Sequence, residues 1–455
     1  MADMSEIDAL FHERCSLLQL GHDLVSNILS IACQYSGVTA SVACTCKPFL
    51  QAVLSSGIKL TLDAASANLT WWGETIQDVQ NLHLELVNNS AASVSALSSL
   101  LILFMSTKGT LGQPHPGVTS LTLGERLFWD KHGLGLLPEI AQIKTLGFAR
   151  DSLHPTDLLM MSDSLRRFTS LTHLALSNCF LGLDSTSEAL TATLLGLSSL
   201  RRLDLDKNCS IGEASAALGA SLQSLRGLEQ LNLNNVGAGG IQALASSLST
   251  LTNLQRLDLG RNTFGESCAL VLADSLRVMP NLRYLDLWSN SMEASGSAAV
   301  SRSLAFMTGL KHLDLSNNSI ADEGSVALSA ALTALYKLED LLLCSNCIGD
   351  DGVSALASCF QFLPSLKHLD LSYNFIGTEG AASLSTGLRT VPGIWVLDLS
   401  SNCFVDGGAL ALAPAFECMP SLRNLDVSSN AIGQTGIAAL QRSLSGLKRL
   451  KYFGF

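Results

Sequence analysis

Leucines and polar residues alternate at regular intervals along most of the chain. The pattern L-x-x-L-x-L-x-x-N recurs, for example as LRYLDLWSN and LKHLDLSNN. It ends on asparagines spaced 28 residues apart, called the ladder asparagines below: Asn262, Asn290, Asn318, Asn346, Asn374, Asn402 and Asn430. The two leucines of each L-x-L pair predict a short strand whose side chains face a core. A fixed period of this length predicts a solenoid, in which the strands of successive repeats stack in parallel.

The first strand leucine marks each repeat. It recurs at Leu174, Leu203, Leu231, Leu257, Leu285, Leu313, Leu341, Leu369, Leu397 and Leu425. Weaker copies lie at Leu82, Leu121 and Leu146, with a truncated copy at Phe453. Return segments of helical periodicity begin at Gly324, Gly352, Gly380, Gly408 and Gly436. Helices are wider than the ~4.8 Å strand spacing, so we expect an α/β horseshoe with parallel strands on the concave face and helices on the convex face.

The 28-residue period and the string LDLSxN…IG…G…AL closely resemble the ribonuclease-inhibitor type of leucine-rich repeat. The resemblance covers roughly residues 68–455 and implies the fold, but one fold hosts many activities. We therefore expect an N-terminal tail over 1–16, a small helical segment over 17–65, and repeats of about 28 residues over 66–455, about 13–15 in number and irregular before 170. The ladder asparagines should be structural, because a buried amide can satisfy backbone groups at the turn after each strand.

The segment 17–65 lacks the repeat and has the apolar spacing of short helices. Its stretches LGHDLVSNILSIA and SVACTCKPFLQAV resemble the two halves of an F-box, in outline L-P-x-x-L-x-x-x-I-L and then V-C-x-x-W. The resemblance implies that an SKP-type adaptor binds Leu20, Leu24, Ile28, Leu29, Val42 and Phe49. The usual proline is Gly21 here and the usual tryptophan has no counterpart. The alternative is a plain helical cap on the solenoid.

Alternation along each strand predicts the side chains on the concave face. The candidate protein-binding residues are Tyr284, Trp288, His312, Asp314, Asp340, Leu342, Cys344, His368 and Asp370. We expect Tyr284 and Trp288 to be exposed there, since aromatic residues are over-represented among binding hot spots. The alternative is that each ring lies flat along the neighbouring repeat. Leu342 and Cys344 interrupt the polar face, because Leu342 stands where the repeats on either side have aspartate.

Aspartates between the two core leucines of each L-x-L pair form a row, which is called the aspartate row below: Asp204, Asp258, Asp286, Asp314, Asp370, Asp398 and Asp426. Neighbouring carboxylates about 5 Å apart repel by roughly 3 kcal/mol at an effective dielectric constant of 20. The face must therefore be hydrated, or cations on the same repeats must offset the charge. The candidates for that role are Arg202, Arg256, His312 and His368. His312 and His368 are two repeats apart, about 10 Å, which is too far to share one metal ion.

The remaining features argue against other functions. The sequence has no P-loop, G-x-S-x-G, H-E-x-x-H or kinase signature, so we expect no enzyme activity, cofactor, metal or small-molecule substrate. The net charge of −11 argues against nucleic acid, and the early apolar stretch ALSSLLILFM is too short to span a membrane. The start MADMSEIDALFHER lacks the features of a secretory signal.

The twelve cysteines are too dilute for a disulfide scaffold. Several recur at equivalent repeat positions, where each follows the ladder asparagine: Cys179, Cys209, Cys347 and Cys403. This pattern predicts packed, reduced thiols in a cytoplasmic or nuclear protein.

Three functions fit this sequence, and all of them are non-catalytic binding or regulation of proteins. We favour a substrate-recognition subunit of a cullin-type ubiquitin ligase, which binds an SKP-type adaptor through 17–65 and a target protein on the concave face. The alternative is a stand-alone scaffold or inhibitor, as ribonuclease inhibitor is, whose N-terminal helices only cap the solenoid. A GTPase activator resembling the Ran GTPase-activating proteins is least favoured. That family commonly ends in a long acidic tail, whereas this sequence ends in LKRLKYFGF.

Overall fold

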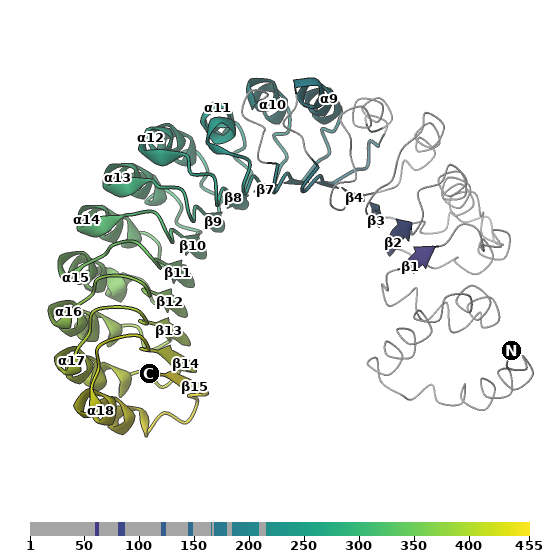
Figure 1. Cartoon of the computed structure of the whole chain (residues 1–455). Helices are drawn as coiled ribbons and strands as arrows, with labels where there is room; N and C mark the ends of the chain where they lie inside the picture. Colours follow the sequence, from purple (N-terminus) through teal and green to yellow (C-terminus); the bar gives the residue numbers. More distant parts are fainter. Residues whose placement is uncertain are drawn as a thin grey trace, which may run out of the picture.

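The computed structural model describes residues 60–62, 81–86, 120–123, 144–148, 165, 168–179, 184–208 and 215–455. These residues form a curved α/β solenoid, with parallel strands along the inner side of an arc and helices along the outer side (Figure 1). The strands make one sheet in which each strand pairs with the next along the chain, from β1 to β15. This is the predicted horseshoe.

The strands are short, and most have three residues. Their bounds are β1 Leu60–Leu62, β2 Asn81–Leu86, β3 Ser120–Leu123, β4 Thr145–Phe148, β5 His173–Ala175, β6 Arg202–Asp204, β7 Gln230–Asn232, β8 Arg256–Asp258, β9 Tyr284–Asp286, β10 His312–Asp314, β11 Asp340–Leu342, β12 His368–Asp370, β13 Val396–Asp398, β14 Asn424–Asp426 and β15 Tyr452–Gly454. Strand β1 pairs with β2 and lies inside the segment 17–65, where the sequence analysis expected only helices. The sheet therefore begins before residue 66.

A helix follows each strand from β5 to β14. The bounds are α9 Asp184–Leu195, α10 Ser215–Leu222, α11 Ala238–Leu248, α12 Gly265–Leu276, α13 Glu293–Leu304, α14 Ala321–Leu332, α15 Asp350–Cys359, α16 Thr378–Leu388, α17 Asp406–Phe416 and α18 Gln434–Leu444, with a 3-10 turn, η3, at Phe360–Phe362. Helices α14 to α18 begin two or three residues before the predicted glycines. The glycines lie within the first helical turn, where the preceding helix is close.

The core of each repeat is built from leucines of the strand, the helix and the turns between them. In one repeat, Leu313 and Leu315 of the strand segment and Leu328 and Leu332 of α14 are at most 1% exposed. Full burial of a leucine side chain contributes about 1.5–3 kcal/mol. Because each repeat covers the core of the next, no repeat buries its apolar face alone.

The ladder asparagines join successive repeats by hydrogen bonds. Asn290 is fully buried, and its Nδ2 donates to the carbonyl oxygens of Leu259 and Leu287 at 2.9 and 2.8 Å. Its Oδ1 accepts from the Asn262 amide at 2.9 Å. A single side chain thus satisfies backbone groups in its own repeat and in the preceding one, which is the predicted structural role.

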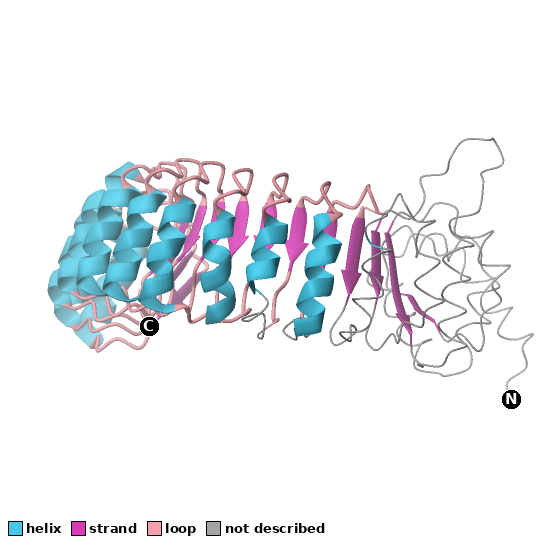
Figure 2. Ribbon diagram, turned by 90° about the horizontal axis from the view of Figure 1, so that it is seen from above, coloured by secondary structure: helices cyan, strands magenta, loops and turns pink. Residues whose placement is uncertain are grey.

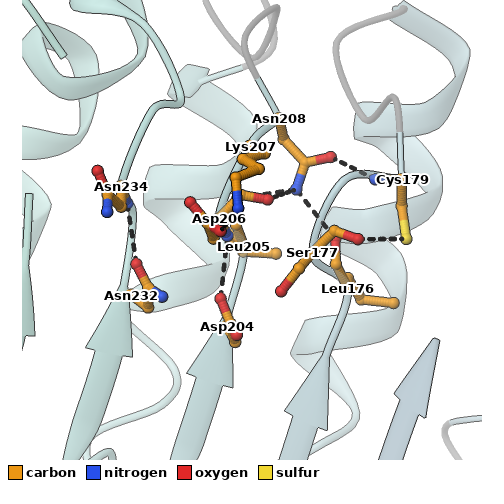
Figure 3. A network of polar contacts seen from close by, with 10 residues as sticks. All are labelled: Leu176, Ser177, Cys179, Asp204, Leu205, Asp206, Lys207, Asn208, Asn232 and Asn234. Carbon is orange, nitrogen blue, oxygen red and sulfur yellow. Dashed lines mark hydrogen bonds and ion pairs between the residues drawn. The ribbon is translucent and has the colours of Figure 1, made fainter. Parts of the chain in front are cut away.

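Figure 3 shows this arrangement at Asn208, whose Nδ2 donates to the carbonyl oxygens of Leu176 and Leu205. Its Oδ1 accepts from the backbone amide of Cys179 at 3.0 Å. Cys179 therefore occupies the position that a ladder asparagine has in other repeats. The sequence analysis had instead placed this cysteine one residue after that position. The small buried thiol fits there, with its Sγ 3.5 Å from the Ser177 carbonyl oxygen.

Aspartates in the first turn of a helix cap the next helix. Asp322 Oδ1 accepts from the amides of Gly349 and Gly352 at 2.7 and 3.0 Å. A Cβ at Gly352 would lie 2.4 Å from that oxygen, so a larger residue there would displace the carboxylate from these bonds. The same pair of bonds joins Asp406 to the Gly433 and Gly436 amides, at 2.7 and 2.9 Å, so it is a repeated device.

The turns gather along the two edges of the arc, one where the strands lead into helices and one where the helices lead back into strands (Figure 2). Among the described residues, no helix combines the length and the apolar character needed to span a bilayer.

Candidate protein-binding surface

The inner face of the arc is formed by the side chains that alternate with the core leucines. In strands β9, β10, β11 and β12 the middle residue is buried and both flanking residues are partly buried. Neighbouring strands pair without a slip, so that His312 lies beside both Tyr284 and Asp340. Equivalent positions therefore form columns across the repeats.

The first of these columns is a continuous stack over β8 to β12, called the stacked column below: Arg256, Tyr284, His312, Asp340 and His368. The Arg256 guanidinium carbon lies 3.6 Å from the centre of the Tyr284 ring. The Tyr284 and His312 rings lie 4.1 Å apart at an angle of 1°. Asp340 then bridges two histidines, with His312 Nδ1 3.3 Å from its Oδ2 and His368 Nδ1 3.8 Å from its Oδ1.

Tyr284 is therefore partly buried and not exposed as predicted. Its ring is stacked between a cation on the preceding repeat and an imidazole on the next. Burial, together with the nearby Asp258 carboxylate, raises the pKa of the Tyr284 hydroxyl to about 12. The tyrosine thus presents a fixed, neutral ring edge and hydroxyl to the concave face.

Trp288 is also partly buried, and it lies over the preceding repeat. A Cβ at Gly260 would lie 2.3 Å from Trp288 Cδ1, so the indole occupies the space that a side chain there would fill. The Arg261 guanidinium carbon lies 4.5 Å from the centre of the indole ring. Asn234 Oδ1 is buried nearby and accepts no hydrogen bond within the described part of the chain. Both aromatic side chains therefore pack against neighbouring repeats and are less exposed than the sequence analysis expected.

The aspartate row has a structural role that the sequence analysis did not assign. Every carboxylate of the row except that of Asp258 accepts a hydrogen bond from the amide two residues later, as Asp314 Oδ1 does from Ser316 at 2.8 Å. Figure 3 shows the same contact between Asp204 and the Asp206 amide, and a neutral version between Asn232 and Asn234. These bonds fix the turn that leaves each strand.

The row also carries an electrostatic cost. Burial, followed by the neighbouring Asp314 and Asp258 carboxylates, raises the pKa of Asp286 to about 6. Burial likewise raises the pKa of Asp258, although Arg256 Nε pairs with its Oδ2 at 2.8 Å. Arg256 thus offsets charge on its own repeat, as predicted. His312 and His368 instead face Asp340 on the repeat between them.

Leu342 and Cys344 interrupt the row at β11, and both are partly buried. Leu342 pairs with Asp314 on one side and Asp370 on the other. It has no oxygen that could accept from the Cys344 amide, so the turn here lacks the bond found in other repeats. An apolar surface replaces a charge between two carboxylates.

Other predicted residues are placed as follows. The adaptor-binding residues proposed from the F-box resemblance, Leu20, Leu24, Ile28, Leu29, Val42 and Phe49, lie outside the described residues. Within the described ranges, no group of three or more histidine, cysteine, aspartate or glutamate side chains is arranged to hold a metal ion. Arg256 and Arg261 were not among the predicted site residues. The rule of alternation gave Arg256 a place on this face, but it did not indicate contact between its guanidinium and a ring on the next repeat.

A comparison with protein families supports this architecture. The sequence profile of the family described as Leucine Rich repeat matches residues 307–329, 337–357, 362–385, 396–413 and 418–440. The matched stretches are leucine-rich repeats. The matched residues include strands β10 to β14 and most of helices α14 to α18. A search of curated proteins found no match.

Solved structures with a similar fold include an internalin (inlF) from Listeria monocytogenes, at 18% sequence identity and a TM-score of 0.47. The match covers 74% of this chain and 86% of the internalin chain. A mouse RP105/MD-1 complex matches at 18% identity and a TM-score of 0.49, over 86% of this chain and 56% of that one. A TLR13-ssRNA13 complex matches at 17% sequence identity and a TM-score of 0.45. This match covers 84% of this chain and 53% of the matched chain.

Proposed function

We propose that this chain is a non-catalytic protein-binding module whose concave face holds a protein partner across β8 to β12. The observation that carries the proposal is the stacked column, a row of aromatic, cationic and acidic groups already held in place by one another. Side chains that are fixed before binding lose little conformational entropy on association. Tyrosine, tryptophan and arginine, all present here, are the residue types that most often dominate binding energy.

The apolar break at Leu342 and Cys344 lies beside this column and supports the same proposal. Partner side chains can bury Leu342 without desolvating a carboxylate, which is costly. On either side of it, the aspartate row makes the concave face acidic, with Asp314 and Asp370 as its nearest members. A partner with basic groups around an apolar centre has the complementary charge.

Substitution of Leu342 by aspartate tests this proposal. A photo-crosslinking amino acid at position 342 would first trap the partner in a cell extract, and the purified partner would then be titrated against variants. We expect Leu342→Asp to weaken binding at least about tenfold, because it places a charge in the apolar contact. Trp288→Ala should also weaken binding, with some loss of stability because the indole covers Gly260.

Val326→Ser is the matched control for this test, since Val326 is an apolar residue of α14 that is 53% exposed. Its binding should equal that of the unmodified chain. If Leu342→Asp binds as tightly as Val326→Ser while both remain folded by circular dichroism, the concave-face assignment is wrong.

We further propose the ribonuclease-inhibitor subclass of repeat and, for residues 17–65, an F-box that docks the chain on a cullin-type ubiquitin ligase. The 28-residue offset between paired strands and the helix in each repeat support the subclass. The support for the F-box is the pattern of residues such as Leu20, Leu24 and Val42 in the sequence. The alternative is a stand-alone scaffold or inhibitor with a helical cap.

A binding assay with a purified SKP-type adaptor and cullin distinguishes these alternatives. We expect the full chain to retain both proteins, and Leu24→Asp with Ile28→Asp to abolish retention. The control is Leu342→Asp, which should retain the adaptor as the unmodified chain does. Absence of any complex at micromolar concentration would leave the scaffold or inhibitor as the function. The proposed location is the cytoplasm or nucleus, which the described cysteines support because they are free thiols.

A further inference from the structure

A groove runs along the edge of the arc at which helices lead back into strands. It has a volume of about 570 Å³, and its charged lining consists of Arg201, Glu229, Arg283, Lys311 and Lys337. Arg201, Glu229, Arg283 and Lys311 immediately precede strands β6, β7, β9 and β10. The groove therefore lies beside the concave face, and its side chains are separate from the stacked column.

The groove is positively charged in a chain whose net charge is −11. Glu229 is its only carboxylate among the lining residues and lies 3.5 Å from Arg201. Lys311 is paired with Glu339 at 2.7 Å. Arg283 and Lys337 are exposed and take part in no ion pair within the described part of the chain. Two cations are thus available to a ligand.

Exposed apolar side chains lie in the same turns that carry these groove residues, where the helices lead back into strands. Phe306 and Tyr336 are each 50% exposed, and Val278 is 44% exposed. Phe306 precedes the groove residue Gly309 by three positions, and Tyr336 is next to Lys337. The Lys337 Nζ lies 5.6 Å from the centre of the Tyr336 ring. The same edge thus offers both positive charge and aromatic surface.

We propose that this groove binds an acidic peptide segment of a protein partner. Its carboxylates would pair with Arg283 and Lys337, and its apolar side chains would cover Phe306 and Tyr336. This surface is distinct from the concave face and has the opposite charge, so it extends the proposed function and does not depend on it. A nucleic acid fits less well, because a polyanion needs a longer run of unpaired cations and would pass close to Asp286 and Asp314 of the aspartate row.

Fluorescence anisotropy with a labelled peptide of sequence EEFEEFEE tests the proposal on the full chain. We expect saturable binding that weakens with salt, and weaker binding of a single-stranded thymidine oligonucleotide. Arg283→Glu with Lys337→Glu should weaken the peptide at least about tenfold, since two favourable charge contacts become repulsive. Phe306→Ser with Tyr336→Ser should weaken it as well.

Arg389→Glu with Arg442→Glu is the matched control, because both arginines are exposed, lie at helix ends and are outside the groove. This control and Leu342→Asp should bind the peptide like the unmodified chain, which separates the groove from the concave face. Three outcomes overturn the proposal: no binding of EEFEEFEE, equal loss with the control pair, or tighter binding of the oligonucleotide than of the peptide.

Discussion

At the scale of single residues, the aspartate row combines a useful hydrogen bond with an electrostatic cost. Asp286 accepts from the Trp288 amide at 2.9 Å, yet burial and the adjoining carboxylates raise the pKa of Asp286 to about 6 from an ordinary value of 3.8. The folded chain therefore binds more protons than the unfolded chain between about pH 4 and 6. The free energy of unfolding falls as the pH rises through that window and stays lower above it.

Asp286→Asn should remove this pH dependence while keeping the hydrogen bond, as Asn232 keeps it with the Asn234 amide at 3.0 Å. We expect the variant to be more stable than the unmodified chain at pH 7.5, by roughly 1–2 kcal/mol after allowance for screening by water, and equally stable near pH 3.5. Urea unfolding followed by circular dichroism across this pH range measures the difference. Asp370→Asn, which alters the same bond to the Ser372 amide, controls for the substitution itself.

An unchanged pH profile in Asp286→Asn would show that other groups set this dependence. Asp370→Asn matching Asp286→Asn at every pH would show that the effect belongs to the whole row and not to Asp286.

At the scale of elements, successive helices are coupled by side chains that reach from one first turn to the next. Asp322 belongs to α14, yet its carboxylate accepts from two amides at the start of α15. A carboxylate at a helix N-terminus satisfies amides that lack a partner within the helix and also interacts favourably with the helix dipole. The start of each such helix therefore depends on the repeat before it.

Asp322→Ala should lower the free energy of unfolding by about 1–2 kcal/mol, the usual effect of losing a helix cap. Glu323→Ala is a close control, because Glu323 is exposed in the same helical turn and its substitution removes the same charge. Its effect should stay within about 0.5 kcal/mol. Thermal and urea unfolding of both variants measure the two values, and equal losses would mean that charge, and not the pair of hydrogen bonds, stabilises α15.

At the scale of the whole molecule, periodicity in the sequence predicts the solenoid, its parallel strand order and the core leucines. The prediction succeeds because every repeat packs its apolar residues against its neighbours in the same way. A pair of leucines such as Leu313 and Leu315 therefore indicates a core strand wherever it recurs. Strand β1 was missed because a three-residue strand carries too little pattern to be recognised without its neighbour β2.

The surface was harder to predict than the core. Alternation correctly placed Tyr284 and Trp288 on the concave face, but their degree of burial depends on what the adjacent repeats leave free. Tyr284 stacks because Arg256 and His312 lie on either side of it, and Trp288 can cover Gly260 because that residue has no side chain. The recurring aspartate and glycine in strings such as IADEG and IGDDG mark the helix caps, because Asp322 and Asp350 accept from amides of the next repeat.

The stacked column crosses the boundaries between five successive strands, from β8 to β12. In a solenoid, each repeat is supported only by its neighbours. A ligand that lies along the stacked column would therefore hold adjacent repeats together across several interfaces. Its binding free energy is shared among the junctions that it spans and strengthens no single repeat alone. The bound stretch would then resist opening as one unit, and affinity would in turn depend on every junction beneath the ligand remaining closed.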